Sequence, residues 1–178
     1  MYDELPMLVH VDRVLVARRM YNGLGGVLFD EMRVEPYVKD LGAYGQPSRY
    51  SKQHDISNWG FYMAFDGSRP VGAVTIAAKT KTIHLLDNRE DISILWDLRV
   101  VDGYKNRRIG TKLFALAVAW SKANGLGQMK IECQTNNVPA CKFYAKQGAV
   151  LRAINEYAYI HDLDLREHEM QLIWYLDL

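Results

Sequence analysis

The chain has 178 residues, which is enough for one substantial hydrophobic core but short for two domains. Hydrophobic residues make up 49% and charged residues 24%, as in an ordinary soluble globular protein, and the formal net charge of +1 argues against broad nucleic-acid binding, which needs a strong basic field. No apolar run approaches the roughly 18 residues of a membrane span, and the acidic start MYDELPMLVHVDRVLV is unlike a signal peptide, so we expect a cytoplasmic protein whose cysteines, Cys133 and Cys141, are reduced.

The first half of the chain alternates strand-like segments with polar turns. Two strands flank the glycine-rich YNGLGG, and a helical or irregular stretch follows. A long polar loop then leads into two strands joined by DGSRP, which predicts a β-hairpin. In chain order these segments are residues 15–19, 27–32, 34–45, 45–58, 59–65 and 71–78. This half predicts sheet structure but carries no motif that indicates a function.

The second half has the clearer helical signals. Leu113, Ala117 and Trp120 recur at helical spacing, and Asn124–Gly125 predicts the end of that helix. After an acidic loop at residues 84–91, the expected order is strand 92–101, helix 111–123, strand 129–135, helix 138–147, and strands 157–160 and 170–176. This order predicts a single α/β (α+β) domain over residues 1–178, with a mixed, mostly antiparallel central sheet flanked by helices.

A basic loop, LRVVDGYKNRRIGTKLF, lies between a predicted strand and the long predicted helix. It holds Lys105, Arg107 and Arg108, and the helix begins at or just after Gly110. The N–H groups of the first helical turn are unpaired and bind anions well, and flanking cations suit a diphosphate. The alternative is a solvated basic turn without a ligand.

Two common phosphate-binding motifs do not fit this chain. A P-loop needs G-x-x-x-x-G-K-[ST], but six residues separate Gly103 from Gly110, and Thr111–Lys112 follows in the wrong order. A dinucleotide fingerprint needs G-x-G-x-x-G, and the stretch from Gly23 lacks the third glycine. Both assignments are therefore disfavoured.

A second polar segment, QTNNVPACKFYAKQGA, follows the strand at residues 129–135. On local physics Asn137 caps a helix, Pro139 lies in its first turn and Gly148 ends it. Phe143 is expected in the core, and a tyrosine such as Tyr144 usually contributes amphipathic packing. These assignments explain the segment without any chemistry.

Taken together, the two segments resemble the GNAT superfamily of N-acetyltransferases, whose coenzyme A loop reads L-x-V-x-x-x-Y-[RQ]-x-x-G-x-[GA]. The matching positions are Leu98, Val100, Tyr104, Lys105 and Gly110 in the first motif, and Asn137, Ala140, Phe143, Tyr144 and Gly148 in the second. Lys105 replaces the usual Arg or Gln, and Arg108 replaces the first glycine. Residues 132–149 are most similar to the streptothricin (nourseothricin) acetyltransferases, which share E-x-Q-T-N-N-V-P-A-C.

The resemblance implies transfer of the acetyl group of acetyl-CoA to a primary amine by direct attack, without a covalent enzyme intermediate. It implies that Asn137 contacts the cofactor arm, that Tyr144 protonates the leaving thiolate, and that a backbone N–H at or next to Leu98 stabilises the oxyanion. The residues expected to bind acetyl-CoA are Leu98, Arg99, Val100, Lys105, Asn106, Arg107, Arg108, Ile109, Gly110, Thr111, Asn137, Ala140 and Tyr144.

The general base has two candidates. Related enzymes often carry an acidic pair just before the L-x-V segment, but here only Asp97 is acidic and Trp96 occupies the partner position. Strand alternation predicts that Trp96 and Asp97 lie on opposite faces of the sheet. Glu132, on the next strand, is the second candidate. For either carboxylate, the alternative is a salt-bridged or exposed strand residue.

The acceptor is expected to be a small-molecule amine bound partly by residues 1–90, with residues 92–160 forming the acetyl-CoA core. Two acidic loops would attract a cation. They contain Asp87, Glu90, Asp91, Asp162, Asp164, Glu167 and Glu169. No nucleic acid or membrane partner is expected, for the reasons of charge and apolar length given above. No metal is expected, because the five histidines lack metal-ligand spacing. A homodimer is among the states common in this family. The open alternatives are a protein N-terminal or lysine acetyltransferase, a non-catalytic acyl-CoA sensor and a plain nucleotide binder.

Overall fold

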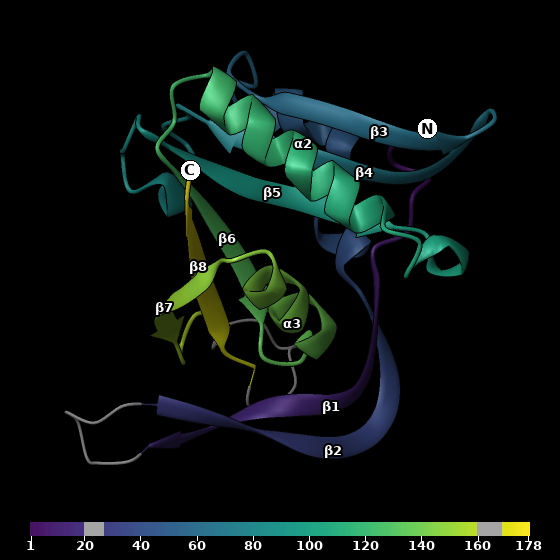
Figure 1. The fold of residues 1–178 in the computed structure, drawn as a ribbon, viewed down its shortest axis with the longest axis vertical. Coiled ribbons are helices and arrows are strands. Elements are labelled where there is room, and N and C mark those ends of the chain that lie inside the picture. The colour runs from purple at the N-terminus through teal and green to yellow at the C-terminus, as the bar shows by residue number, and fades with distance from the viewer. Residues whose placement is uncertain (20–26, 160–168) are drawn as a thin grey trace.

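The computed structural model describes residues 1–19, 27–159 and 169–178. Within them, a six-stranded sheet has the order β3-β4-β5-β6-β8-β7, and a separate two-stranded sheet contains β1 and β2 (Figure 1). Only β5 and β6 pair in parallel in the large sheet, so the predicted mixed, mostly antiparallel architecture is confirmed. The elements are β1 (Leu8–Arg19), β2 (Val27–Asp40), α1 (Tyr50–Gln53), β3 (Gly60–Asp66), β4 (Arg69–Ala78), β5 (Ile92–Val100), α2 (Ile109–Ala123), β6 (Gln128–Gln134), α3 (Val138–Lys146), β7 (Val150–Asn155) and β8 (Gln171–Asp177).

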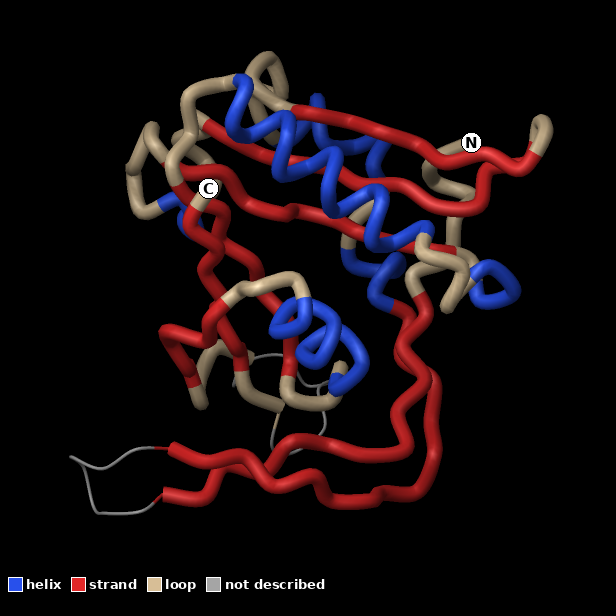
Figure 2. The backbone as a smooth tube through the Cα atoms, in the orientation of Figure 1, coloured by secondary structure: helices blue, strands red, loops and turns tan. Residues whose placement is uncertain are grey.

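The core fills both faces of this sheet. On one face α2 and α3 cover the strands (Figure 2). α2 buries Leu113, Phe114 and Ala117, which its helical period places on one side. On the other face, α1 and the loops around it pack on Ile92 and Ile94 of β5. The central strand β4 is buried on both faces over most of its length, which explains its nearly unbroken apolar sequence.

β5 and β6 separate part-way along the sheet. Their parallel pairing joins Ile92–Leu95 to Gln128–Ile131 and stops there, after which β5 continues beneath α2 while β6 turns toward α3 (Figure 1). Beyond Leu95, the edge of β5 that faces β6 therefore has no strand partner among the described residues, and part of its backbone N–H and C=O groups could bond a ligand. We call the gap between the diverging strands the splay.

One secondary-structure prediction, for residues 34–45, was wrong in the region of the two-stranded sheet. Residues 34–45 were expected to be helical or irregular, but β2 runs through Asp40 and pairs with β1. Pro36 made this strand hard to predict from the sequence, because proline has no backbone N–H to donate to a neighbouring strand. The structure accommodates it where the register with β1 is irregular, between the pairs Val11–Tyr37 and Arg13–Arg33.

The C-terminal strands contain a second correction. A strand was expected at residues 157–160, whereas the strand β7 ends at Asn155, residues 156–159 form turns, and Ile160 lies outside the described residues. β7 is an edge strand with mostly exposed side chains, and a register irregularity between Leu151 and Ala153 breaks the period of two that reveals a strand. In the described part of the chain, no helix has the length and apolarity that crossing a bilayer requires.

Candidate active site

The backbone at the start of α2 could bind an anion. Arg108, the N-cap residue, and Asn106 both have left-handed φ angles, 63° and 62°, which are uncommon for residues other than glycine. No side chain caps this helix, and the first hydrogen bond back to the cap is donated by Lys112 to Arg108. The N–H groups of the preceding helical residues are therefore left without an intrahelical partner, as an anion requires.

The cations of this loop are unequally available. Lys105 donates to the Leu8 carbonyl oxygen (3.2 Å) and pairs with Asp102 (2.5 Å), so it also fastens the loop to β1. The Arg107 guanidinium lies over the Tyr104 ring, 5.0 Å from its centroid. Arg107 and Arg108 are exposed, and neither forms an ion pair with a residue that the structure describes. They remain free to meet a phosphate.

Gly110 faces the gap between α2 and α3. A Cβ atom added there would lie 3.7 Å from Val100 and 4.0 Å from Phe143, which is ordinary van der Waals contact. Packing within the protein therefore does not require a glycine at this position. Close approach of a ligand to the backbone would require one.

Six further cofactor-binding candidates lie on β5, at the start of α2 and at the start of α3. Leu98 and Val100 turn their side chains into the helix-side core, so they can contribute through the unpaired edge of β5. Asn137 accepts a hydrogen bond from the Ala140 N–H (3.3 Å) and is the N-cap of α3, as local physics predicts. Ile109 and Ala140 pack beside the core, and Thr111 is exposed at the start of α2.

Tyr144 is buried beside the splay with an uncommitted hydroxyl. Its ring lies 6.3 Å from Phe114 and 5.5 Å from Phe143, and its hydroxyl makes no hydrogen bond to any described residue. Burial, followed by the nearby Cys133, Cys141 and Asp97, raises the pKa of the phenol well above its usual value. Tyr144 is therefore protonated and able to donate.

Cys133 and Cys141 belong to the core around Tyr144. Both are buried free thiols with their sulfurs 3.4 Å apart, and the Trp174 indole N–H donates to Cys133 (3.2 Å). The hydrogen bond with Cys141 and burial raise the pKa of the Cys133 thiol well above its usual value. Cys133 thus lacks the thiolate that nucleophilic chemistry needs, which supports a packing role.

A bulge in β5 overturns the prediction for Trp96 and Asp97. Thr75 of β4 pairs with Asp97 while the adjacent Ile76 pairs with Leu95, so Trp96 is the extra residue. The bulge resets the alternation of side chains. Trp96 and Asp97 both contact Tyr50, through a ring contact at 6.2 Å and a hydrogen bond at 3.3 Å, and both therefore lie on the face opposite the two helices.

Asp97 is held in a buried ion pair. Arg99, two residues along the same face, donates from Nε (3.0 Å) and from Nη2 to the two carboxylate oxygens. Both side chains are only 3% exposed, and Arg99 also donates to the Leu5 carbonyl oxygen (2.8 Å). The Arg99 side chain, a cofactor-binding candidate, is thus committed on the face away from α2. Asp97, a base candidate, has both oxygens engaged.

Glu132 presents a different environment. It projects from β6 on the same face as Trp96 and forms no ion pair with any described residue. Tyr159 donates to Glu132 Oε1 (2.5 Å), and Gln134 donates to the Tyr159 hydroxyl (3.3 Å). No sequence signal indicated Tyr159, which lay in a stretch predicted as a strand, whereas Gln134 is the glutamine of the E-x-Q-T-N-N motif. Of the two carboxylates, only Glu132 has an oxygen, Oε2, that accepts no hydrogen bond from a described residue.

The acidic loops contribute less free charge than their composition suggests. Asp87 pairs with Lys130 (2.7 Å) and Asp91 with Arg89 (2.6 Å). Glu169 pairs with Lys39 (2.5 Å) and accepts a hydrogen bond from Asn136. Asp162, Asp164 and Glu167 lie outside the described residues. For the three paired carboxylates, intramolecular ion pairs account for the charge.

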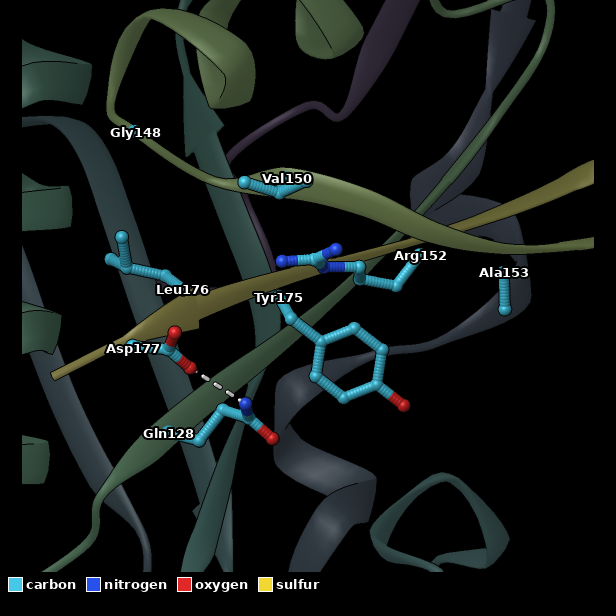
Figure 3. Close-up of a pocket in the computed structure, with 8 residues that line it drawn as sticks. All are labelled: Gln128, Gly148, Val150, Arg152, Ala153, Tyr175, Leu176 and Asp177. Atoms are coloured by element: carbon cyan, nitrogen blue, oxygen red, sulfur yellow. Dashed lines mark hydrogen bonds between the residues drawn. The ribbon is translucent and has the colours of Figure 1, made fainter. Parts of the chain in front are cut away.

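A surface hollow of about 470 Å³ lies elsewhere (Figure 3). It is lined by the paired end of the sheet, where Gln128 donates to Asp177 (2.8 Å) and Arg152 and Tyr175 form part of the wall. Gln128 begins β6, whereas the splay opens beyond Ile131. The hollow therefore does not belong to the candidate site.

The chain is similar to known acetyltransferases in sequence and in fold. Streptothricin acetyltransferase A of Bacillus subtilis is 28% identical over 93 residues, which are 52% of this chain and 53% of that protein, so the match spans about half the length of the curated relative. A Bacillus anthracis protein assigned as a streptothricin acetyltransferase, solved with acetyl coenzyme A, superposes with a TM-score of 0.77 over 98% of this chain and 88% of its own, at 23% identity. The crystal structure of a nourseothricin acetyltransferase gives 0.74 over 99% and 90%, at 19% identity.

The family assignment rests on the larger part of the sequence. The model of the acetyltransferase (GNAT) family matches residues 28–149, a stretch that includes the basic loop, Glu132 and the α3 motif. The resemblance drawn from the two short motifs is thereby confirmed. The chain belongs to the acetyltransferase (GNAT) family.

Proposed function

We propose that this protein transfers the acetyl group of acetyl-CoA to a primary amine of a small molecule, by direct attack of the amine. One observation carries the proposal, and it concerns the two faces of the sheet at the splay. On one face lie the uncapped start of α2, which could bind an anion, and the protonated Tyr144. On the other face lies Glu132, a carboxylate without an ion-pair partner among the described residues. Donor and acceptor can therefore approach from opposite faces of the sheet.

The cofactor side is chemically suited to coenzyme A. The unpaired N–H groups of α2 and the free Arg107 and Arg108 would hold the diphosphate, and the open edge of β5 would bond the amide groups of the pantetheine arm. The thioester supplies an activated acetyl group. Asn137 and the gap beside Gly110 complete this side. The acetyl coenzyme A complex of the Bacillus anthracis protein, which shares the fold, supports the assignment.

Two side chains would move the protons. Glu132 would take a proton from the ammonium form of the acceptor, which must lose it before its nitrogen can attack the thioester carbonyl. Tyr144 would donate a proton to the sulfur as the carbon–sulfur bond breaks. A backbone N–H at or beside Leu98 would stabilise the oxyanion. Asp97 is the weaker base candidate, because Arg99 engages both of its oxygens.

The acceptor class is proposed from the partial matches to known proteins. The partial matches to streptothricin acetyltransferases favour a cationic antibiotic of that kind, with residues 1–90 contributing to its site. Residues 1–178 would then act as one acetyltransferase domain. A peptide acceptor is the competing class.

The test is an acetylation assay on the purified protein. Acetyl-CoA is incubated with a streptothricin, an aminoglycoside, a polyamine and lysine-containing peptides, and CoA release is followed with a thiol reagent while mass spectrometry locates the acetyl group. Release with the streptothricin and a mass gain on its amine are expected. Acetylation of peptides alone would reassign the acceptor, and cofactor binding without release for any amine would refute the enzymatic proposal.

A further inference from the structure

The environment of Glu132 contains a residue that no motif identifies. Tyr159, in the turn after β7, donates its hydroxyl hydrogen to Glu132 Oε1 at 2.5 Å. Gln134, two residues along β6 from Glu132, donates to the same hydroxyl at 3.3 Å. The three side chains form a short chain of hydrogen bonds on the acceptor face of the sheet.

We infer that Tyr159 is a positioning residue that fixes the orientation of the Glu132 carboxylate for proton removal from the acceptor amine. The inference rests on the proposed function, in which Glu132 is the base. A glutamate on a strand has three rotatable bonds, and a base that is misplaced by about 1 Å can lose much of its effect. The bond to Oε1 restricts this freedom and leaves Oε2 for the amine.

The phenol is suited to this task because it keeps its proton. Burial, followed by the nearby Glu132 carboxylate, raises the pKa of Tyr159 well above its usual value. Gln134 supplies a donor to the phenol oxygen, so the phenol hydrogen is directed to Glu132 instead. Among the described residues, a further charged group that acts on Tyr159 is Glu169, whose own charge is paired with Lys39.

The chain offers a matched control for the loss of one hydroxyl. Tyr157 lies two residues away in the same turn and is 71% exposed. Tyr157→Phe removes the same atom without touching Glu132. Tyr159→Phe keeps the ring and its packing, so the hydrogen bond is the principal loss.

The experiment compares four proteins with the native chain: Tyr159→Phe, Tyr157→Phe, Glu132→Gln and the Tyr159→Phe/Glu132→Gln double variant. For Tyr159→Phe we expect kcat to fall about tenfold, because a hydrogen bond to a charged group is lost, while the Kd for CoA stays unchanged. Tyr157→Phe should match the native chain. In the Glu132→Gln background, Tyr159→Phe should have no further effect on kcat.

Each outcome bears on the inference. A native kcat for Tyr159→Phe overturns it while leaving the acetyltransferase proposal intact, and so does a fall of the same size in both backgrounds, which would indicate a merely structural tyrosine. A native kcat for Glu132→Gln removes the base that Tyr159 is inferred to position. A native chain that acetylates no amine overturns the proposed function and the inference together.

Discussion

The buried ion pair between Asp97 and Arg99 gives a sharp prediction about stability. Replacing Arg99 by Met keeps most of the apolar volume but leaves the Asp97 carboxylate buried without its cation. Both side chains are 3% exposed, and the guanidinium makes hydrogen bonds to both Asp97 oxygens and to the Leu5 carbonyl. Removing one partner of such a pair destabilises a protein by about 3–5 kcal/mol.

Chemical denaturation followed by tryptophan fluorescence measures this loss. For a domain of this size, it corresponds to a fall in Tm of roughly 10 °C. The Arg99→Met/Asp97→Asn double variant should recover part of the loss, because it no longer buries an unpaired charge. Arg18→Met is the control, since its pair with Asp30 is more than half exposed on both sides. A loss below about 1 kcal/mol for Arg99→Met would refute the reasoning that the pair is desolvated.

Three further predictions follow from the site. Gly110→Ala should leave the free energy of unfolding within about 1 kcal/mol of native, because an added Cβ meets only ordinary van der Waals contacts, but weaken acetyl-CoA binding at least about tenfold by calorimetry. Native affinity would show that no ligand passes there. Tyr144→Phe should lower kcat about tenfold or more with little change in the Kd for CoA, and an unchanged kcat would remove Tyr144 as the acid. Alkaline stability tests the buried phenols: because the folded-state pKa of Tyr144 is raised, the unfolded chain loses its proton first, so stability should fall above about pH 10, and Tyr144→Phe should reduce that slope by about 1.4 kcal/mol per pH unit. A slope equal to that of the native chain would contradict the raised pKa.

Features that depend on neighbouring residues were predictable from sequence. The spans of α2 and α3 and the Asn137 cap agree closely with expectation, because helical periodicity and capping act within one or two turns. The two family motifs could be recognised in the sequence for the same reason. Each motif lies around one strand-to-helix connection, β5 to α2 or β6 to α3.

The faces on which Trp96 and Asp97 lie, and the strand that contains Pro36, could not be predicted in this way. Alternation placed Trp96 and Asp97 on opposite faces, but pairing with β4 introduces a bulge that puts them on the same one. Pairing with β1 likewise turned the stretch containing Pro36 into strand. A local pattern fixes the period of a strand, while its register depends on a partner elsewhere in the chain.

The choice between the two candidate bases also came from tertiary contacts. Asp97 meets Tyr50 across 47 positions of sequence, and Glu132 meets Tyr159 across 27. A carboxylate is recognisable in the sequence, but whether it is paired, buried or free depends on which distant segments pack against it. Local spacing thus predicted the cofactor-binding candidates of this acetyltransferase-family protein. Only the packing of remote segments showed that Arg99 engages Asp97 and that Glu132 forms no ion pair with a described residue.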